Sequence, residues 1–452
     1  MNLLLRRGVV WDRLRGALWI LPTVSILFFL LAGAVLSRVV IGNGSPWRWL
    51  AFQGTAEDAR QLLIVVSATM ITVTGLVFAL TIVALQIAAG QYSPRLLRNF
   101  MRDLGTQLVL SIFVGAFAYS TAGLFTVGIQ RGGQDQFVPR LAVTGSLALG
   151  LASVFVLVYF IHHLTRSIQI DVIMGQVERE AGAVIDDVYP DPAGRTEPEE
   201  RCPDPPASAV AVPSARSGYI QAVQPEALIG AAIHYDLTVR LTGMVGEYVV
   251  EGTTIAWAWR RSPDEPPPKP ELLGPAIGQS VEIGFERTML QDVGFGIRRL
   301  VDIANKALSP AINDPYTAVQ AVHHLSVLLC SLARRRLGDR LHRDGRGTIR
   351  VAVPLPQFAD YLRLGTAQIR RYGAGEPALA RSLIELLNDV GGSTLDPGRR
   401  AAVARHLWLV LQDAERRTSQ PADVELVRAD AAAALDALGM QPPTTTTIGA
   451  DQ

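Results

Sequence analysis

The sequence has little cysteine, little lysine and little charge for its 452 residues. Two cysteines, Cys202 and Cys330, exclude a disulfide framework and form no zinc-binding pattern. Charged side chains make up 18% of the chain and leave a net charge of +1, which argues against a protein whose whole surface binds nucleic acid. Lys269 and Lys306 are the only lysines, so arginine supplies almost all of the 42 basic side chains. This bias is typical of a GC-rich bacterial genome.

Motifs for catalysis, metals and cofactors are also missing. The sequence contains no Walker A loop, no HExxH, no CxxC and no G-x-S-x-G. His162–His163 and His323–His324 are adjacent pairs, so they do not form the i,i+4 clamp that holds a metal on a helix. We therefore expect a protein that is not an enzyme and has no metal and no cofactor.

Hydrophobic side chains, by contrast, reach 49% of the chain. They gather in four uncharged stretches, at residues 17–36, 62–89, 108–127 and 141–161. A spanning helix needs roughly 20 apolar residues to cross about 30 Å of hydrocarbon, and each stretch meets that length. We therefore expect a transmembrane domain of four helices over residues 1–165. The first stretch exceeds the roughly 7–15 residues of a signal-peptide core, so we expect an uncleaved anchor.

Arginines are unevenly shared between the two sides of these stretches. Eight lie in the amino-terminal arm, after the second stretch and directly after the fourth, against five in the remaining loops. The positive-inside rule places the richer side in the cytoplasm. We expect a multi-pass protein of the bacterial cytoplasmic membrane with both termini in the cytoplasm.

The second stretch is the longest and carries the most polar residues. Its 28 residues would extend about 42 Å as a helix, so the helix should tilt or project from the bilayer. Ser67, Thr74 and Thr81 recur every seven residues, and Gln86 adds an amide that needs a partner in hydrocarbon. These four are candidate pore-lining residues in a homo-oligomer. The alternative is that the hydroxyl groups pack between helices.

A short amphipathic helix is expected directly after this stretch. Ser93 and Pro94 suit the N-cap and first helical positions. Arg95, Arg98 and Arg102 would then share one face of the helix. That face would contact anionic headgroups of the lipid bilayer, or would form an arginine ring that attracts anions to a pore mouth.

The remaining chain predicts a cytoplasmic α+β region in which a small β-rich subdomain precedes a helical subdomain. Alternation at Leu237, Val239 and Leu241 indicates a strand, and proline-rich segments mark linkers. The expected order is a helical stalk (166–188), a linker (189–217), the β-rich subdomain (218–262), a second linker (263–278), the helical subdomain (279–440) and a disordered tail (441–452).

The helical subdomain contains the densest group of polar residues outside the membrane. Its candidate residues are Asp292, Arg298, Asp302, Asn313 and Asp314. Arg298 and Asp302 have the spacing of an ordinary i,i+4 helix pair. Gly294 and Gly296 lack the third glycine of a dinucleotide-binding fingerprint. A charged helix closed by a capped turn accounts for the pattern, and a phosphate or nucleotide site is the alternative.

Two segments of the chain together resemble a known bacterial family. One runs from Thr74 to Arg98 and ends in GQYSPRLLR, and the other runs from Asp292 to Thr317 and contains DVGFGIR and ALSPAINDPYT. They are similar to the predicted membrane proteins with domain of unknown function 2254, and the likeness extends from the first apolar stretch to about Asp436. The resemblance implies four spans and a cytoplasmic domain, and it implies no activity and no catalytic residues.

Two functions remain open from the sequence. The first is an oligomeric channel for ions or small solutes, lined by the second stretch and regulated by the cytoplasmic region. The second is a membrane-anchored sensor or scaffold that binds a ligand or protein partner through that region.

Overall fold

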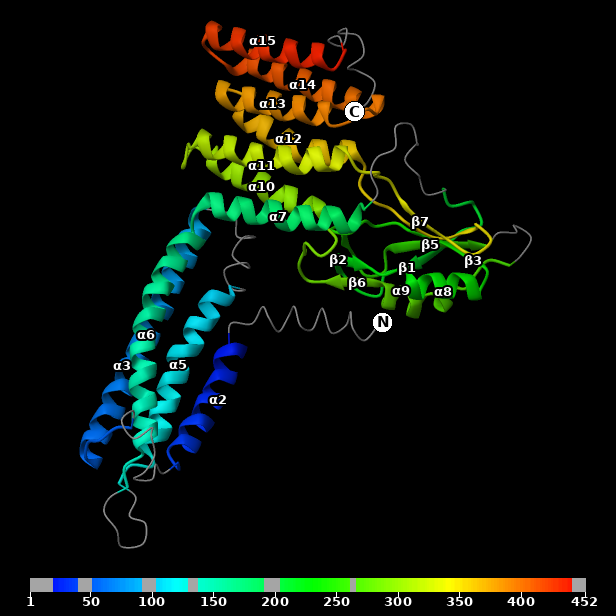
Figure 1. Cartoon of the computed structure of the whole chain (residues 1–452). Coiled ribbons are helices and arrows are strands. Elements are labelled where there is room, and N and C mark those ends of the chain that lie inside the picture. Colours follow the sequence, from blue (N-terminus) through cyan, green and yellow to red (C-terminus); the bar gives the residue numbers. More distant parts are fainter. Residues whose placement is uncertain are drawn as a thin grey trace. The chain divides into compact units, whose positions relative to one another are not determined.

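The computed structural model forms two compact units, Met1–Val172 and Ile173–Gln452 (Figure 1). It describes residues 19–39, 51–91, 103–128, 137–190, 204–260 and 266–440, without the side chains of residues 88–91. Several predictions therefore fall outside the described residues, namely those for Arg95, Arg98 and Arg102, residues 191–203 of the first linker and the tail over 441–452.

The first unit is helical. Its described helices are α2 (Ile20–Leu36), α3 (Ala56–Gln91), α5 (Leu104–Leu124) and α6 (Arg140–Ser167). Helix α5 packs against the other three. In its apolar 18-residue segment 67% of the residues are buried, against 22% in the corresponding segments of α3 and α6. Gly33 and Gly115 let α2 and α5 approach closely, because a Cβ at either position would collide with the facing helix.

Four helices in the described part of the chain are long and apolar enough to cross a membrane. Three are α3, α5 and α6, and the fourth is α11 (Pro315–Ala333) in the second unit. Helix α2 is also apolar but has 17 described residues, starting next to the undescribed amino-terminal segment. In α11, Val322, Leu325 and Leu329 are fully buried against neighbouring helices. Packing within the second unit therefore accounts for the apolar character of α11.

Two helices cover the segment 166–188 that was predicted as a helical stalk. Helix α6 ends at Ser167, and a new helix, α7 (Ile170–Val188), begins three residues later. Met174, Val177, Ala181 and Ile185 of α7 have no exposed surface, so this face belongs to the core of the second unit. An amphipathic helix with so regular an apolar face needs a partner to cover it.

The second unit contains two small sheets. A five-stranded sheet has the order β1 (Val210–Pro213), β5 (Thr254–Arg260), β3 (Leu237–Leu241), β8 (Ile349–Val353) and β7 (Arg340–Arg343). A three-stranded sheet has the order β4 (Tyr248–Val249), β2 (Gly218–Val223) and β6 (Val281–Gly284). All described pairs are antiparallel except β3–β8. Short helices α8 (Glu226–His234) and α9 (Gly274–Ser280) and the 3-10 turn η3 (Pro270–Leu272) accompany the strands.

Strands extend beyond the predicted β-rich segment, residues 218–262. Strand β1 lies in the predicted first linker, and β6, β7 and β8 lie in the predicted helical subdomain. The pair Val239–Val351 joins strands more than a hundred residues apart in sequence. The two predicted subdomains therefore share one sheet. A local hydrophobic pattern could not predict this, because it contains no information on pairing between distant segments.

Six longer helices of the second unit form two layers. They are α10 (Val293–Ala307), α11, α12 (Phe358–Gly373), α13 (Pro377–Gly392), α14 (Pro397–Arg417) and α15 (Pro421–Ala437). Helices α10, α12 and α14 pack side by side in one layer, and α11, α13 and α15 do so in the other (Figure 1). We call this arrangement of three consecutive helix pairs the helical stack.

Candidate functional site

The stripe of predicted pore-lining residues Ser67, Thr74 and Thr81 of α3 is half-buried, and its hydroxyl groups form hydrogen bonds within the single chain. Ser67 Oγ lies 3.2 Å from Thr121 Oγ1 of α5. Thr74 and Thr81 donate to carbonyl oxygens one turn earlier on α3, at 2.7 and 2.8 Å. Gln86 is exposed on the surface of the single chain. Bonds of this kind are common where hydroxyl-bearing helices pack in membranes.

A buried apolar ridge runs beside this stripe. Leu63, Met70, Val77 and Ala84 recur every seven residues on α3 and are at most 5% exposed. Met70 and Val77 join residues of α5 and α6 in one apolar cluster. The pore-lining role stays a prediction, and the position of the stripe beside a packed ridge favours helix contact.

An ionisable pair that the sequence analysis did not single out joins α5 to α6. Asp103 caps α5 by accepting from Thr106 N at 2.9 Å, and it lies 2.7 Å from His163 Nε2 of α6. The ring of His163 occupies the space that a Cβ at Gly105 would need. The spacing Asp103-x-x-Thr106 before an apolar helix is an N-cap pattern that could have identified one half of this contact.

The predicted polar cluster of the second unit is divided between the two ends of α10. Asp292 caps the start of α10, and Asp314 caps α11 by accepting from Thr317 N at 3.1 Å. The 15 residues of α10 separate these caps by about 22 Å. Arg298 and Asp302 form the expected pair on one helix, at 2.8 Å.

Asn313 completes this set, and it is exposed with a left-handed φ of 51° just before the Asp314 cap. The left-handed region is one that asparagine adopts more readily than most residues. The five candidates therefore form caps, a turn and a helix pair at separate places, and they do not converge on one phosphate or nucleotide.

Asp292 nevertheless lies at the centre of a buried polar joint. It is 4% exposed, and Arg287 donates to both of its carboxylate oxygens, at 2.5 and 3.1 Å. Gly246 has a left-handed φ of 92°, and a Cβ there would collide with Asp292 Oδ2 and with Arg287. Burial raises the pKa of Asp292, although the hydrogen bonds and charge of Arg287 oppose that shift. The joint therefore ties the β3–β4 loop to the start of α10.

Two tyrosines extend this joint to α7 and α12. The hydroxyl groups of Tyr189 and Tyr361 lie 3.0 Å apart, and both residues are buried. Burial raises the pKa of Tyr361 well above its usual value, with a further contribution from the charge of Asp292. The Tyr361 hydroxyl group therefore remains protonated near neutral pH.

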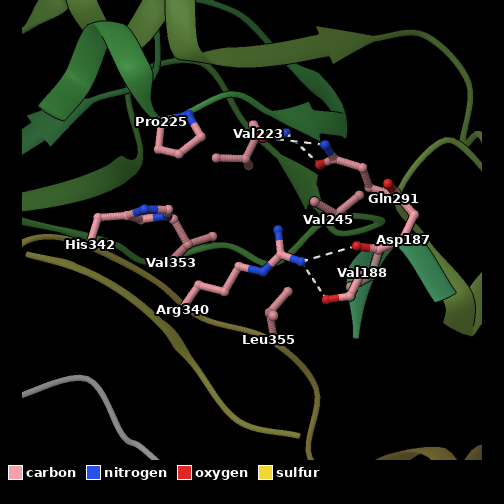
Figure 2. A pocket seen from close by; sticks show the side chains of 10 residues that line it. All are labelled: Asp187, Val188, Val223, Pro225, Val245, Gln291, Arg340, His342, Val353 and Leu355. Carbon is pink, nitrogen blue, oxygen red and sulfur yellow. Dashed lines mark hydrogen bonds between the residues drawn. The ribbon is translucent and has the colours of Figure 1, made fainter. Parts of the chain in front are cut away.

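A small cavity lies close to the joint, between the end of α7, the strands and Gln291 (Figure 2). Its volume is about 30 Å³, which suffices for one or two water molecules. Figure 2 shows Arg340 donating to the carbonyl oxygens of Asp187 and Val188, and Gln291 bonding to the backbone of Val223. The size of the cavity fits a hydrated structural joint better than a site for an organic substrate.

His342 also lines this cavity, and its Nε2 atom has no hydrogen-bond partner within the described part of the chain. Burial lowers the pKa of His342, and the charge of Arg340 lowers it further. His342 is therefore neutral near pH 7. Among the described residues, no group of three or more His, Cys, Asp or Glu side chains is placed to hold a metal ion.

A larger opening than this cavity is a groove between α14 and α15, at the end of the helical stack. Its volume is about 360 Å³. The groove is lined by Trp408, Leu411, Arg428, Ala432, Leu435, Asp436 and Met440. Leu411 and Leu435 are 7% and 5% exposed and form an apolar floor, whereas Arg428 and Asp436 are exposed at the rim. We call it the α14–α15 groove. Its residues were absent from the sequence candidates.

Comparisons with known proteins agree with the membrane character of the first unit. A family model described as Predicted membrane protein (DUF2254) matches residues 15–389. The chain is 45% identical over 451 residues to Uncharacterized protein Mb1321c of Mycobacterium bovis and to Uncharacterized protein Rv1290c of Mycobacterium tuberculosis. The alignments cover 99% of this chain and 86% of each relative. No solved structure matches the chain.

Proposed function

Because the chain belongs to the DUF2254 family of predicted membrane proteins, we propose that it is a membrane-anchored scaffold whose second unit binds a partner. The observation that carries the proposal is the helical stack with its open α14–α15 groove. Stacked helix pairs bury a continuous core between neighbours and present extended surfaces that other proteins bind. The proposed role is binding, and the cavity beside Arg340 and His342 has room for only one or two waters.

The proposal places the first unit in the bacterial cytoplasmic membrane, with lipid around its apolar helices. Leu151, Phe155 and Val158 of α6 and Val65 of α3 expose more than half of their surface in the single chain. Apolar side chains exposed in this way suit hydrocarbon. The arginine distribution supports cytoplasmic termini, which puts the second unit in the cytoplasm.

We expect a partner to protect the α14–α15 groove in native membranes. In a chain carrying Cys202→Ser and Cys330→Ala, the Ala432→Cys variant offers a thiol inside the groove. A membrane-impermeant maleimide should label it in inverted vesicles about tenfold more slowly than in dilute purified protein, since bound partner blocks the reagent. Labelling rates, followed by gel shift, measure this ratio.

Ala433→Cys is the matched control, because Ala433 is an exposed alanine of the same helix that does not line the groove. Its thiol should react at similar rates in inverted vesicles and in purified protein, and it should stay unlabelled in right-side-out vesicles. Equal rates for both variants in both samples would contradict a bound partner. Rapid labelling from the outside would contradict the cytoplasmic placement.

A channel formed by several copies is the second candidate function. Helix α3 has 36 residues, and Gln86 is exposed on it in the single chain. An amide facing hydrocarbon lacks partners, so contact with another copy or with water would suit it. The half-buried Ser67, Thr74 and Thr81 would then line a path only if the copies rearranged the contacts of α3 with α5.

Thiol accessibility and flux together separate the channel from the scaffold. Under the scaffold proposal, Ser67→Cys, Thr74→Cys and Thr81→Cys should resist a small water-soluble thiol reagent, as should the buried control Val77→Cys. Liposomes containing the parent protein should conduct no more than empty liposomes. Fast labelling of the first three variants, together with flux that a bulky Thr74→Trp exchange reduces, would instead establish the channel.

A further inference from the structure

We propose that the α14–α15 groove takes the same groove of a second copy of this chain, around a twofold axis that passes close to Ala432. The inference deepens the proposed scaffold function and rests on it, because it names the partner of that surface. In a twofold interface, a residue that contacts a second residue of the other copy is matched by the reverse contact between the same two residues. The surface must therefore be complementary to itself.

The charges at the rim of the groove have this self-complementarity. Arg428 and Asp436 lie four residues before and four residues after Ala432, so all three share one face of α15. Two copies of α15 crossing antiparallel at Ala432 would place Arg428 of each chain opposite Asp436 of the other. The interface would then gain two ion pairs from one pair of residues.

The side chains of Arg428 and Asp436 are both accessible for such a contact. Glu415 of α14 holds Arg428 through Nε and Nη2, at 3.0 and 2.7 Å, which leaves Nη1 available for another acceptor. Asp436 is exposed and has no ion-pair partner among the described residues. Arg428 is thus oriented in advance, and the exposed Asp436 carboxylate is accessible to a basic side chain of a second copy.

The apolar part of the groove fits a second α15 helix. Ala432, at the proposed axis, is exposed and carries only a methyl group, so two helices could approach to about 8 Å. Trp408, Leu411 and Leu435 lie beside it and would be covered by the same residues of the second copy. Leu411 and Leu435 are already largely buried, so Trp408 and Ala432 offer the apolar surface that a second copy would cover, and the charged rim fixes the register.

The order of the helical stack points to the same face. Each earlier pair is covered by the next one, because α12 and α13 pack on α10 and α11, and α14 and α15 pack on α12 and α13. No described helix follows α15. A second copy would continue the stack with its own last pair, and the twofold axis would close the assembly instead of extending it.

Disulfide formation at the axis tests the proposal on the full-length chain. With Cys202→Ser and Cys330→Ala, the Ala432→Cys variant in detergent and in native membranes should give a covalent dimer under mild oxidation. Two thiols next to a twofold axis can reach the roughly 4 Å between Cβ atoms that a disulfide requires. The Ala433→Cys variant, whose side chain points about 100° away around the helix, should remain mostly monomeric.

Charge exchange then tests the register. Asp436→Arg should lower the crosslinking of the Ala432→Cys variant about tenfold, because it opposes Arg428 of the partner copy with a like charge. Combining Asp436→Arg with Arg428→Glu should restore most of the crosslinking. Ala437→Arg, an added charge on α15 outside the groove lining, should leave it unchanged.

The outcomes separate this inference from the scaffold proposal. If the Ala432→Cys variant is protected in native membranes but forms no dimer, the second copy is wrong and another partner occupies the groove. Equal crosslinking of the Ala432→Cys and Ala433→Cys variants would mean random collision and would also overturn the inference. A dimer that forms only after removal of residues 441–452 would identify that segment as the occupant, with the same consequence.

Discussion

Replacing Asp292 with alanine is expected to lower the free energy of unfolding around the start of α10 by about 3 kcal/mol. Removal of one partner from a buried ion pair typically costs about 3–5 kcal/mol, because the other charge is left uncompensated. Arg287 is 32% exposed and can reach water, which places the effect at the low end of that range. The variant also loses the cap on Phe295 N. Hydrogen exchange of the α10 amides in the full-length protein should become roughly 100-fold faster.

Asp430→Ala is the matched control for this prediction. Asp430 also pairs with an arginine, Arg381 at 2.6 Å, but both side chains are more than a third exposed. An exposed pair contributes at most about 1 kcal/mol, so exchange of the surrounding amides should change by less than about fivefold. If both variants accelerated exchange equally, the buried joint around Asp292 would contribute no more than a surface contact.

The apolar helices of the first unit could be predicted because length and hydrophobicity are local properties of the sequence. The second stretch was expected over 62–89, and α3 begins earlier, at Ala56. Its first turn carries Glu57 and Asp58, which favour a helix start through the helix dipole. The prediction for this helix counted only uncharged residues, so it began after Glu57, Asp58 and Arg60, although the helix includes these three residues.

The sheets were only partly predictable, because strand pairing depends on residues that are distant in sequence. Strand β7 reads Arg-Leu-His-Arg, which has no apolar alternation strong enough to distinguish it from a loop. Strand β8 is apolar, but its parallel partner β3 ends more than a hundred residues earlier. Tertiary context, and not local propensity, makes these segments strands.

For the candidate sites, the sequence identified single residues better than their partners. Asp314, which precedes Pro315, could be assigned as a helix cap from the sequence, whereas the cap formed by Asp292 was not predicted. Asp292 contacts Arg287 and Gly246, and its charge acts on Tyr361 of α12, and no local spacing encodes this arrangement. For the α14–α15 groove, the sequence contains only the i,i+4 spacing of Arg428, Ala432 and Asp436. This spacing does not predict a groove, because the other wall is formed by helix α14.

Acidification is expected to destabilise the helical stack through His406 of α14. Burial lowers the pKa of His406 from 6.5 to about 4, and the charges of Arg370, Arg405 and Arg363 contribute further. Thr366 Oγ1 donates to Leu362 O, so it accepts from His406 Nδ1 at 2.8 Å, and Nε2 carries no proton. The folded stack therefore holds the neutral imidazole.

The sign of the effect follows from the two pKa values. Between pH 6.5 and about 4 the unfolded chain binds a proton at this histidine and the folded chain does not, so stability falls as the pH falls through that window. The loss from this one group approaches about 3 kcal/mol near pH 4, and above pH 7 the group contributes no pH dependence.

The His406→Asn variant isolates this contribution, because its amide can still donate to Thr366 and does not titrate. Hydrogen exchange of α12 and α14 amides should accelerate more steeply in the parent than in the variant between pH 7 and pH 4.5, after correction for the intrinsic rate. Carboxyl groups that titrate in the same range affect both proteins alike, so the difference between the two slopes belongs to His406. Parallel slopes would mean that His406 gains its proton in the folded stack as easily as in the unfolded chain.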